Sequence, residues 1–319
     1  MATLEGYVSG AWMKRLAATF LLLAISRDPA VSQSVPAATQ TQIVLLGTGT
    51  PRPDPQRSGP ATAIVVNDTP YLVDAGPGIV RRAQTAFENG IRGLAVANLR
   101  TVFFTHLHSD HTVGYPDLIF TTWVQGRKVP LQAYGPDGLT AMTSHILEAW
   151  RADIDIRTNG LERRSATGAA VEAHDARPGV VYQDTNVKVT AFPVPHGEWR
   201  QAFGYRFDTP DRTIVISGDT SPSPALVENC HQCDVLIHEA FSEDFQPADM
   251  PNWLEYRSKY HTTTTQLAEI ANKTQPKLLV VYHRGVGPRG REISDQQYLT
   301  EIQRTYRGKV VIGQDLDVY

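Results

Sequence analysis

The sequence predicts a layered α/β protein in which two β-sheets pack against each other and helices cover their outer faces. Three observations lead to this prediction. Apolar runs of strand length alternate with segments of helical spacing along most of the chain. The series of strands and helices occurs twice in succession, which indicates two sheets. Polar residues follow the apolar runs in both halves, so they are expected at strand ends along one common edge.

The composition is that of a globular protein. The chain has 319 residues, 41% of them hydrophobic and 20% charged, and it can bury a large core in one domain or two modest ones. Its net charge of -3 provides no overall positive field, so composition alone does not favour a nucleic-acid partner.

The N-terminus has the features of a signal peptide. Lys14 and Arg15 precede an apolar run over residues 16–25, and small residues suited to export peptidases follow. This order predicts an exported protein, periplasmic or secreted, that is cut near Gln33; a buried N-terminal helix is the alternative. The apolar run is too short to cross a bilayer, so no membrane segment is expected in the mature form.

The domain organisation follows from this leader. The signal peptide is expected over residues 1–32, a polar linker over 33–41 and one folded domain over 42–319. The first twelve residues fit no part of the leader pattern, and Met13 is an alternative start.

The first half of the chain alternates strands and helices. Strands are expected at 42–46, 62–66, 71–73, 101–104 and 131–134, and helices at 78–87, 110–123 and 139–150. Residues 152–185 have mixed character and are expected to form an irregular surface excursion, with a short strand near 180–182.

The second half repeats this rhythm. Strands are expected at 187–194, 203–207, 213–216, 234–237, 277–282 and 309–312, and helices at 222–228, 263–271 and 295–306. A loop rich in aromatic residues is expected up to Tyr260. Cys230 and Cys233 are expected to serve local structure, and whether they form a disulfide is left open.

The loop after the strand at 101–104 contains four potential metal ligands within six residues: His106, His108, Asp110 and His111. Imidazole nitrogen and carboxylate oxygen together suit Zn²⁺ and neighbouring first-row metals, whereas Mg²⁺ and Ca²⁺ prefer oxygen ligands. The density and order of these side chains favour a metal site over a merely solvated polar loop.

Three further strands end in a residue of the same kind: His196, Asp219 and His283. Seven candidate ligands are too many for one tetrahedral centre, so two ions are expected, zinc first, with Mn²⁺ or Fe as alternatives. Asp74 also ends a strand, and it is expected to support the ligands through hydrogen bonds.

The order of these residues resembles the metallo-β-lactamase superfamily, whose fold is a four-layer αββα sandwich with a metal pair at one edge. The resemblance runs from about Gln42 to the C-terminus. Secondary motifs most resemble the ribonuclease Z branch of that superfamily. They are Leu46-Gly47-Thr48-Gly49-Thr50-Pro51, Phe203-Gly204-Tyr205, Leu236-Ile237-His238-Glu239-Ala240 and His261-Thr262-Thr263.

The resemblance implies two zinc ions and their ligands. His106, His108 and His196 would bind one ion. Asp110, His111 and His283 would bind the other, with Asp219 bridging the two. Two cations that share a water lower its pKa, which supplies a hydroxide nucleophile near neutral pH.

The resemblance also implies catalytic roles. The residues expected to act in catalysis are Asp110, Glu239 and His261. Glu239 is expected to orient His261 and raise its pKa, so that the imidazole serves as an acid for the leaving group or contacts the phosphate. His238 is expected to support the site without binding metal. His145, His174 and His231 lie outside the pattern and are expected at the surface.

One feature differs from the ribonuclease Z branch, which has a long arm that grips transfer RNA between the Phe-Gly-Tyr strand and the Ser-Gly-Asp turn. Here that interval is only Asp208 to Arg212, the length of a hairpin turn. The expected partner is therefore a small ester and no large nucleic acid. The aromatic residues Trp199, Trp253, Tyr256 and Tyr260 are expected to form pocket walls or to cover the core.

The expected function is an exported dinuclear zinc hydrolase of small esters, with phosphodiesters or aryl sulfates first. Hydrolysis of a carboxylic ester or a lactone is the alternative. A tRNA 3′-processing endoribonuclease and a non-catalytic metal-binding protein rank below these, and a homodimer is left open.

We expect the leader to be removed on export. In protein expressed from the full chain in a bacterium, mass spectrometry of the exported fraction should find a mature chain without residues 1–32. Leu21→Arg with Leu22→Arg should block export, because charges interrupt the apolar run. Full-length protein recovered only from the cytosol would contradict this prediction.

Overall fold

The computed structural model describes residues 41–244, 251–285 and 293–319. The predicted signal peptide and all of the predicted linker except Thr41 lie outside the described residues, so the leader and the start at Met13 stay predictions.

The described residues form two β-sheets. The first has the strand order β1-β2-β3-β4-β5-β6 and the second the order β13-β12-β11-β10-β9-β8-β7. The strands of the first sheet are Thr41–Gly47, Ala61–Val66, Thr69–Val73, Thr101–Phe103, Leu131–Gly135 and Val171–Asp175 for β1 to β6. Those of the second are Gly179–Gln183, Lys188–Pro193, Phe203–Asp208, Thr213–Ile216, Val235–Ala240, Leu278–Arg284 and Val310–Ile312 for β7 to β13.

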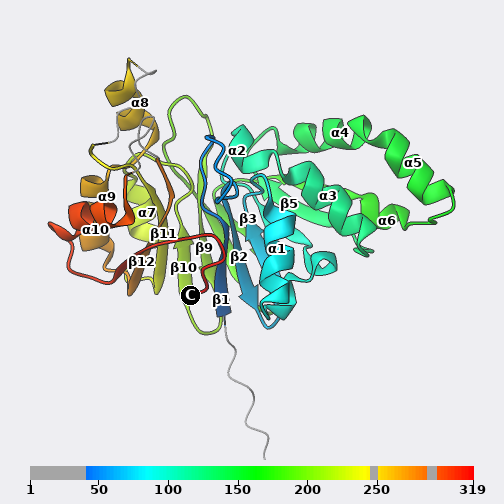
Figure 1. Cartoon of the computed structure of the whole chain (residues 1–319), viewed down its shortest axis with the longest axis horizontal. Helices are drawn as coiled ribbons and strands as arrows, with labels where there is room; N and C mark the ends of the chain where they lie inside the picture. The colour runs from blue at the N-terminus through cyan, green and yellow to red at the C-terminus, as the bar shows by residue number, and fades with distance from the viewer. Residues whose placement is uncertain (1–40, 245–250, 286–292) are drawn as a thin grey trace, which may run out of the picture. The chain divides into compact units, whose positions relative to one another are not determined.

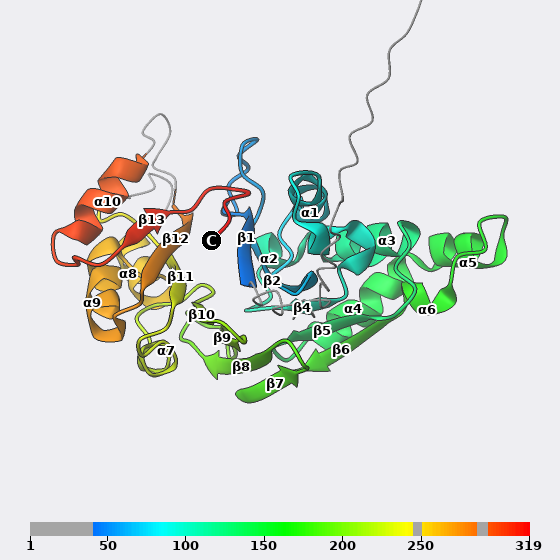
Figure 2. The ribbon, with the colours of Figure 1, turned by 90° about the horizontal axis from the view of Figure 1, so that it is seen from below.

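Helices cover the outer face of each sheet (Figures 1 and 2). Beside the first sheet lie α1 (Ile79–Glu88), α3 (Tyr115–Val124) and α4 (Leu139–Ala149). Beside the second lie α7 (Pro224–Asn229), α9 (Thr264–Thr274) and α10 (Asp295–Gln303). The predicted α/β class with four αββα layers is confirmed.

The two sheets face each other across a shared apolar layer. Phe103 of the first sheet is fully buried, and its ring centroid lies 5.6 Å from the ring centroids of both Tyr205 and Phe207 of the second. Separate clusters of buried residues fill the space between each sheet and its helices. The burial of β11 on both faces explains its continuous apolar run, which is typical of a central parallel strand.

Strand direction places the loops of interest at a common edge within each sheet. β3 and β4 run parallel, as do β10, β11 and β12. Two antiparallel steps make β8 parallel to β10 as well. The segments that follow these strands therefore leave from the same edge, which is where polar residues follow the apolar runs in the sequence.

Residues 152–185 differ from the prediction of an irregular excursion. They contain most of α5 (Arg151–Asn159), all of α6 (Ala166–Ala169), and β6 and β7 at the edges of the two sheets. Helix α5 buries no residue, and ion pairs of Arg157 with Asp153 and Glu162 support it. Ile154 is only partly buried against the first core, so α5 has too small an apolar face for its hydrophobic period to be detected in the sequence.

The aromatic loop before Tyr260 also differs, because it contains helix α8 (Trp253–Tyr260). Trp253, Tyr256 and Tyr260 are spaced as i, i+3 and i+7 and share one face of this helix. The predicted helix at 110–123 is divided into α2 (Ser109–Thr112) and α3.

Two smaller findings complete the fold. Cys230 and Cys233 form a disulfide between α7 and β11. Over the part of the chain that the structure describes, no helix has the length and apolar character needed to span a membrane.

The C-terminal segment is tied to the loop after β1 by one carboxylate. Asp315, whose side chain is 6% exposed, accepts hydrogen bonds from the backbone N–H groups of Thr48 (2.8 Å) and Ser58 (2.7 Å) and pairs with Arg82. Asp315→Ala should lower the free energy of unfolding by about 2–4 kcal/mol, because two backbone donors lose their partner.

Urea unfolding followed by circular dichroism measures this loss. Asp153→Ala is the matched control, because Asp153 is 41% exposed and forms a surface ion pair. It should cost about 1 kcal/mol or less. Equal losses in the two variants would contradict the assigned role of Asp315.

Candidate metal centre

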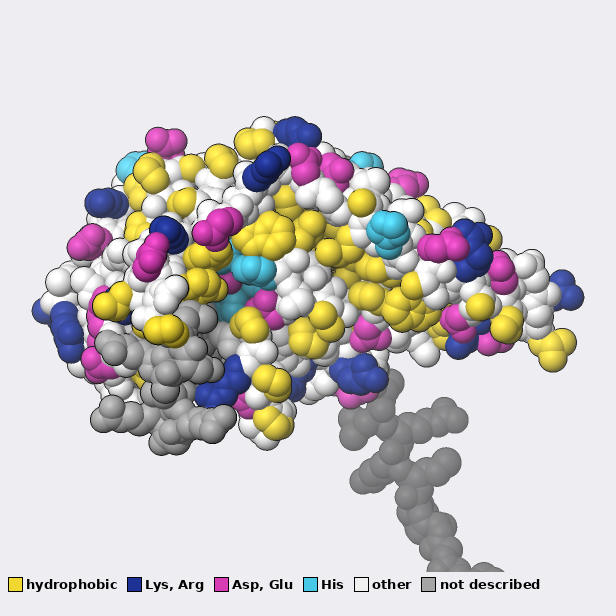
Figure 3. Space-filling view, turned by 90° about the horizontal axis from the view of Figure 1, so that it is seen from above, with side chains coloured by type: hydrophobic (Ala, Val, Ile, Leu, Met, Phe, Trp, Pro, Cys, Tyr) yellow, Lys and Arg dark blue, Asp and Glu magenta, His cyan; other side chains and the backbone are white. Residues whose placement is uncertain are grey.

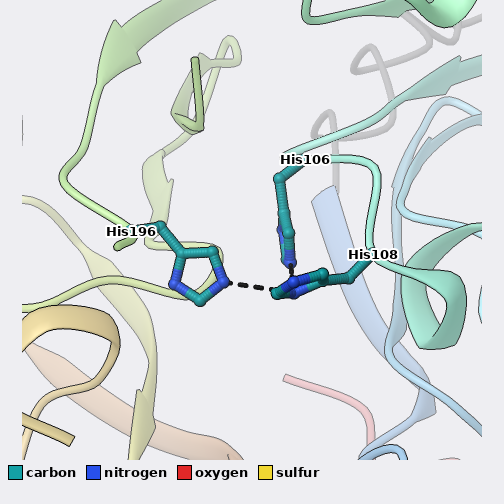
Figure 4. A group of neighbouring side chains, drawn as sticks. All are labelled: His106, His108 and His196. Carbon is teal, nitrogen blue, oxygen red and sulfur yellow. Dashed lines mark hydrogen bonds between the residues drawn. The ribbon is translucent and has the colours of Figure 1, made fainter. Parts of the chain in front are cut away.

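The first group of ligand side chains joins two distant segments. His106 and His108 follow β4, and His196 follows β8. His108 Nδ1 lies 2.9 Å from His106 Nε2 and 3.2 Å from His196 Nε2. Figure 4 shows the three rings converging from the two loops. Their ligand atoms lie within 4.8 Å of one another, a grouping that could hold a metal ion.

A second group lies beside the first. Asp110, His111 and His283 also present ligand atoms within 4.8 Å of one another. His111 Nε2 is 3.1 Å from His283 Nε2, and Asp219 Oδ2 lies 3.1 Å from the same His283 atom. Asp219 also groups with His106 and His111, so its carboxylate reaches both groups. The structure thus brings together all seven residues that the sequence singled out as ligands.

The unpaired atoms of this cluster fit cations. Asp110 Oδ2 and Asp219 Oδ1 are buried and accept no hydrogen bond from the residues that the structure describes. A buried carboxylate oxygen without a donor is costly, and a divalent cation compensates it. Imidazole nitrogens and carboxylate oxygens are also the donor set that zinc prefers. The residues present therefore fit divalent metal.

Hydrogen bonds to Nδ1, on the side of the ring away from the cluster, orient three of the histidines. His111 Nδ1 lies 2.9 Å from Asp74 Oδ2, His106 Nδ1 lies 3.0 Å from Thr105 Oγ1, and His196 Nδ1 lies 2.8 Å from the Tyr260 carbonyl oxygen. Each contact leaves the Nε2 atom directed at the cluster. Asp74 takes the supporting position expected from its strand end, and its Oδ1 also accepts from the Thr105 N–H at 2.8 Å.

Two residues of the centre have a strained backbone. Asp74 and His283 have φ values of 61° and 42°, in the left-handed region that non-glycine residues rarely adopt. Gly218, with φ 62°, allows the tight turn before Asp219, because a Cβ there would lie 2.8 Å from Thr105 Cβ. Such strain persists only where surrounding contacts over-determine the backbone, which is common at functional sites.

Burial sets the charge state of the histidines. It lowers the pKa of His106 well below its usual range and that of His196 to about 3, so both imidazoles stay uncharged and able to bind a cation. Burial opposes charge on His111 too, but the carboxylates of Asp219 and Asp74 outweigh it and raise the His111 pKa.

His261 and Glu239 form a buried pair beside this cluster. His261 Nδ1 lies 2.9 Å from Glu239 Oε1, which also accepts from the Thr220 N–H at 3.0 Å. His261 groups with His196 and Asp219 within 4.8 Å. Thr262, which stands where the ribonuclease Z branch has serine, donates to the Thr220 carbonyl and so joins the two loops.

The expected rise in the His261 pKa is wrong in direction. Burial lowers it to about 4, although the Asp219 carboxylate opposes this. Burial and the charge of Asp219 raise the pKa of Glu239 well above its usual range. Desolvation outweighs the attraction between the partners, because both lie out of contact with water.

The remaining histidines lie where the sequence predicted. His145, His174 and His231 are exposed. His238 is buried and points its Nδ1 at the Glu239 carbonyl oxygen, 2.6 Å away. The sequence analysis missed Thr105 and the Tyr260 carbonyl as orienting groups. Thr105 could have been found from its place beside His106, whereas a backbone carbonyl carries no sequence signal.

Comparison with known proteins places these residues in a family context. Residues 69–284 match the family model described as the beta-lactamase superfamily domain. A protein named ribonuclease Z from Mycobacterium avium (strain 104) is 31% identical over 278 residues, which cover 86% of this chain and 96% of that relative. The match to the family model includes all seven ligand positions.

Solved structures show the same fold. Human tRNase Z, short form, superposes with a TM-score of 0.64 at 23% identity, over 87% of this chain and 98% of that one. The metallo-beta-lactamase fold protein YhfI from Bacillus subtilis has a TM-score of 0.66 at 18% identity, over 88% and 99% of the two chains. At these identities the likeness concerns the fold alone.

We expect Asp74→Ala to weaken metal binding by about 10- to 100-fold, because the ring of His111 loses its orienting carboxylate. Competition with a chromogenic zinc chelator measures the affinity. Asp117→Ala is the matched control, because Asp117 lies on α3, where its carboxylate accepts from Thr121, and it belongs to none of the groups that could hold a metal. Unchanged zinc affinity in Asp74→Ala would contradict the supporting role.

Proposed function

The chain belongs to the beta-lactamase superfamily, and we propose that within it this protein is a metal-dependent hydrolase that cleaves phosphodiester bonds in RNA. Its relatives in Mycobacterium are named ribonuclease Z and align with it over nearly their whole length. The observation that carries the proposal is the position of the His261–Glu239 pair, which lies against the cluster of seven ligand side chains.

These relatives overturn the expectation of a small ester as substrate. Phosphodiesters or aryl sulfates are the first expectation from sequence and carboxylic esters or lactones the alternative, in part because residues 208–212 leave no room for a transfer-RNA-binding arm. The structure does have a short hairpin there, between β9 and β10. The expectation that no large nucleic acid binds is wrong nonetheless, since relatives with the ribonuclease name align over most of their length.

The lengths of the aligned chains explain why a short hairpin does not exclude a nucleic-acid substrate. The alignment with the Mycobacterium avium protein extends over 278 residues and takes in 96% of it, while covering 86% of this chain. A relative of that length has no room for a long insertion that this chain lacks. The short hairpin therefore does not separate this chain from proteins named ribonuclease Z.

The metal roles follow from the two groups. In our proposal His106, His108 and His196 would hold one divalent ion, zinc first. Asp110, His111 and His283 would hold a second, and Asp219 would serve both groups. When bound, such an ion pair activates a water and stabilises negative charge on the phosphate oxygens during an in-line displacement. The protein contributes rigid strand ends that fix the geometry.

His261 and Glu239 would supply the proton that the leaving oxygen needs. In the proposed step a proton lies between Glu239 Oε1 and His261 Nδ1, which are 2.9 Å apart, and the other ring nitrogen carries a second proton. When the imidazole gives that second proton to the leaving oxygen, the proton shared with Glu239 moves onto Nδ1. The ring then stays neutral and Glu239 becomes a carboxylate.

The cellular compartment of the protein depends on the predicted leader. The predicted leader lies outside the described residues, and export stays a prediction. Whether the mature protein is exported decides which RNA it meets, but the chemistry of the centre is the same in either compartment.

We expect zinc-loaded protein to cleave a precursor transfer RNA with a 3′ extension. His261→Ala should lower kcat by about 100- to 10,000-fold, the usual loss on removal of a general acid, with zinc content unchanged. Glu239→Gln should lower kcat by a factor in the same range. In the double variant the two losses should not multiply, because the residues act as a unit.

His145→Ala is the matched control, since His145 is an exposed histidine on α4. It should retain full activity. Gel analysis of end-labelled RNA and metal analysis of each variant are the measurements. An absence of RNA cleavage by the zinc-loaded wild type, or full activity of His261→Ala, would sink the proposed function.

A further inference from the structure

The loop that follows β8 places one aromatic ring and one cation beside the ligand groups. We call residues 197–201, whose sequence is Gly-Glu-Trp-Arg-Gln, the His196 loop, because it begins after that ligand. The Trp199 ring centroid lies 5.0 Å from that of His108 and 6.0 Å from that of His106. Trp199 Nε1 lies 2.8 Å from His108 Nε2. A substrate held at these ligands would therefore lie next to the indole.

The His196 loop is fixed at both of its ends. The Gly197 N–H donates to a carbonyl oxygen of α8 at 3.0 Å, and a Cβ on Gly197 would lie 1.9 Å from Tyr260 Cζ. At the other end, Gln201 Oε1 accepts from the Asp137 N–H at 2.8 Å, which ties the loop to the segment before α4. Trp199 is therefore held in place before a substrate arrives, and this lowers the entropic cost of binding.

Neither face of the Trp199 indole is stacked by a ring that the structure describes. Its two ring contacts are nearly perpendicular, at 85° to His108 and 75° to His106, and its Nε1 edge faces His108. Trp199 is only half-buried, and it packs against none of the hydrophobic clusters that the described residues form. Figure 3 shows histidine side chains at the surface with hydrophobic side chains beside them. The indole thus offers ring surface to a ligand at the metal centre.

The aromatic residues of α8 use their faces for packing instead. The rings of Trp253 and Tyr256 stack with centroids 5.7 Å apart, and those of Tyr256 and Tyr260 stack at 4.4 Å. Gly197 closes the far side of the Tyr260 ring. Of the four aromatic residues that the sequence indicates as pocket walls or core cover, Trp199 is the one with an unstacked ring.

The charge beside this indole is not neutralised within the described residues. Arg200 is exposed, and it forms no ion pair or hydrogen bond with them. The neighbouring Glu198 interacts electrostatically with Lys259 of α8. An aromatic ring next to a free cation is the combination that binds single-stranded RNA, because every base has a π face and every linkage carries a negative charge.

We infer that the His196 loop binds a nucleotide that flanks the scissile phosphate, with Trp199 stacked on its base and Arg200 in contact with its outer phosphate. This inference deepens the proposed function and rests on it. A phosphodiester held at the ligand groups has one nucleoside on each side, and the Trp199 indole is the unstacked ring next to those groups. The nucleoside on the other side gains no stacking from Trp199.

Paired RNA substrates test the stacking. The scissile bond is first mapped on the unmodified RNA with zinc-loaded protein, and two further RNAs each lack the base on one side of that bond. Loss of the base that Trp199 stacks should lower kcat/KM by about 5- to 150-fold, the range that stacking supplies. Loss of the other base should change kcat/KM by less than about threefold.

The protein side of the cycle uses Trp199→Leu, which keeps apolar bulk and removes the ring. This variant should lose as much as the sensitive abasic RNA does, and the two changes together should lose no more than either alone. Trp199→Phe keeps a ring and should retain most of the wild-type kcat/KM. Trp150→Leu is the matched control, because Trp150 is a 41% exposed ring that stacks on Phe120 at the start of α5. It should behave as wild type.

Zinc affinity separates stacking from support of a ligand, because the indole touches His108. In competition with a chromogenic chelator, Trp199→Leu should bind zinc as the wild type does. A 2-aminopurine at the sensitive position, in RNA with an uncleavable phosphonate at the scissile bond, should be quenched by zinc-loaded wild type and not by Trp199→Leu at saturation.

The salt dependence of binding to the same uncleavable RNA tests the phosphate contact. In Arg200→Gln the slope of the logarithm of the association constant against the logarithm of salt concentration should become shallower by about 0.7, the value for one phosphate contact on a single strand. Arg304→Gln is the matched control, because Arg304 is an exposed arginine at the end of α10. Its slope should equal that of the wild type.

Losses that multiply at both positions, an unquenched 2-aminopurine, weakened zinc binding in Trp199→Leu or an unchanged salt slope in Arg200→Gln would overturn the nucleotide site, while RNA cleavage would still support the proposed function. If no RNA is cleaved at all, the proposed function fails and the nucleotide site fails with it.

Discussion

The buried cluster of imidazoles and carboxylates is the constraint on which the rest of this structure depends. His106, His111, Asp219 and His283 are each at most 4% exposed, and their polar atoms face one another. A protein interior does not stabilise so many polar groups in one place without compensation. Divalent cations compensate them, and the fold is arranged so that five strand ends deliver the ligands and their supports to one edge.

That arrangement requires strained backbone conformations, which the surrounding contacts stabilise. Asp74 and His283 adopt left-handed backbone conformations, and the turns at Gly197 and Gly218 admit no larger residue. In return, Asp74 orients His111, and the Tyr260 carbonyl orients His196. The ring of the same Tyr260 lies beside that of His261. The residues proposed to bind metal and to hold the proton are therefore connected through Tyr260.

Much of this structure was predictable from sequence, because the motifs that indicate it lie within short segments of the chain. Four ligand residues lie within six positions after an apolar strand, and the other three each follow a strand, so the centre and the αββα layers could be predicted together. The structure of residues 152–185 could not, since α5 buries nothing and β6 and β7 are half-exposed edge strands. The pKa of His261 was misjudged because burial, which sequence does not reveal, outweighs its carboxylate partner. The expectation of a small ester as substrate is wrong because the short hairpin at residues 208–212 does not separate this chain from relatives named ribonuclease Z.

Metal analysis of the intact protein tests the central claim most directly. Zinc-reconstituted protein, freed of loose metal by gel filtration, should contain two zinc ions per chain by inductively coupled plasma mass spectrometry, and anomalous scattering from its crystals should place both between β4, β8, β10 and β12. Asp219→Ala should retain at most one ion. Zinc that is absent, or that lies away from His106, His196 and His283, would contradict the account.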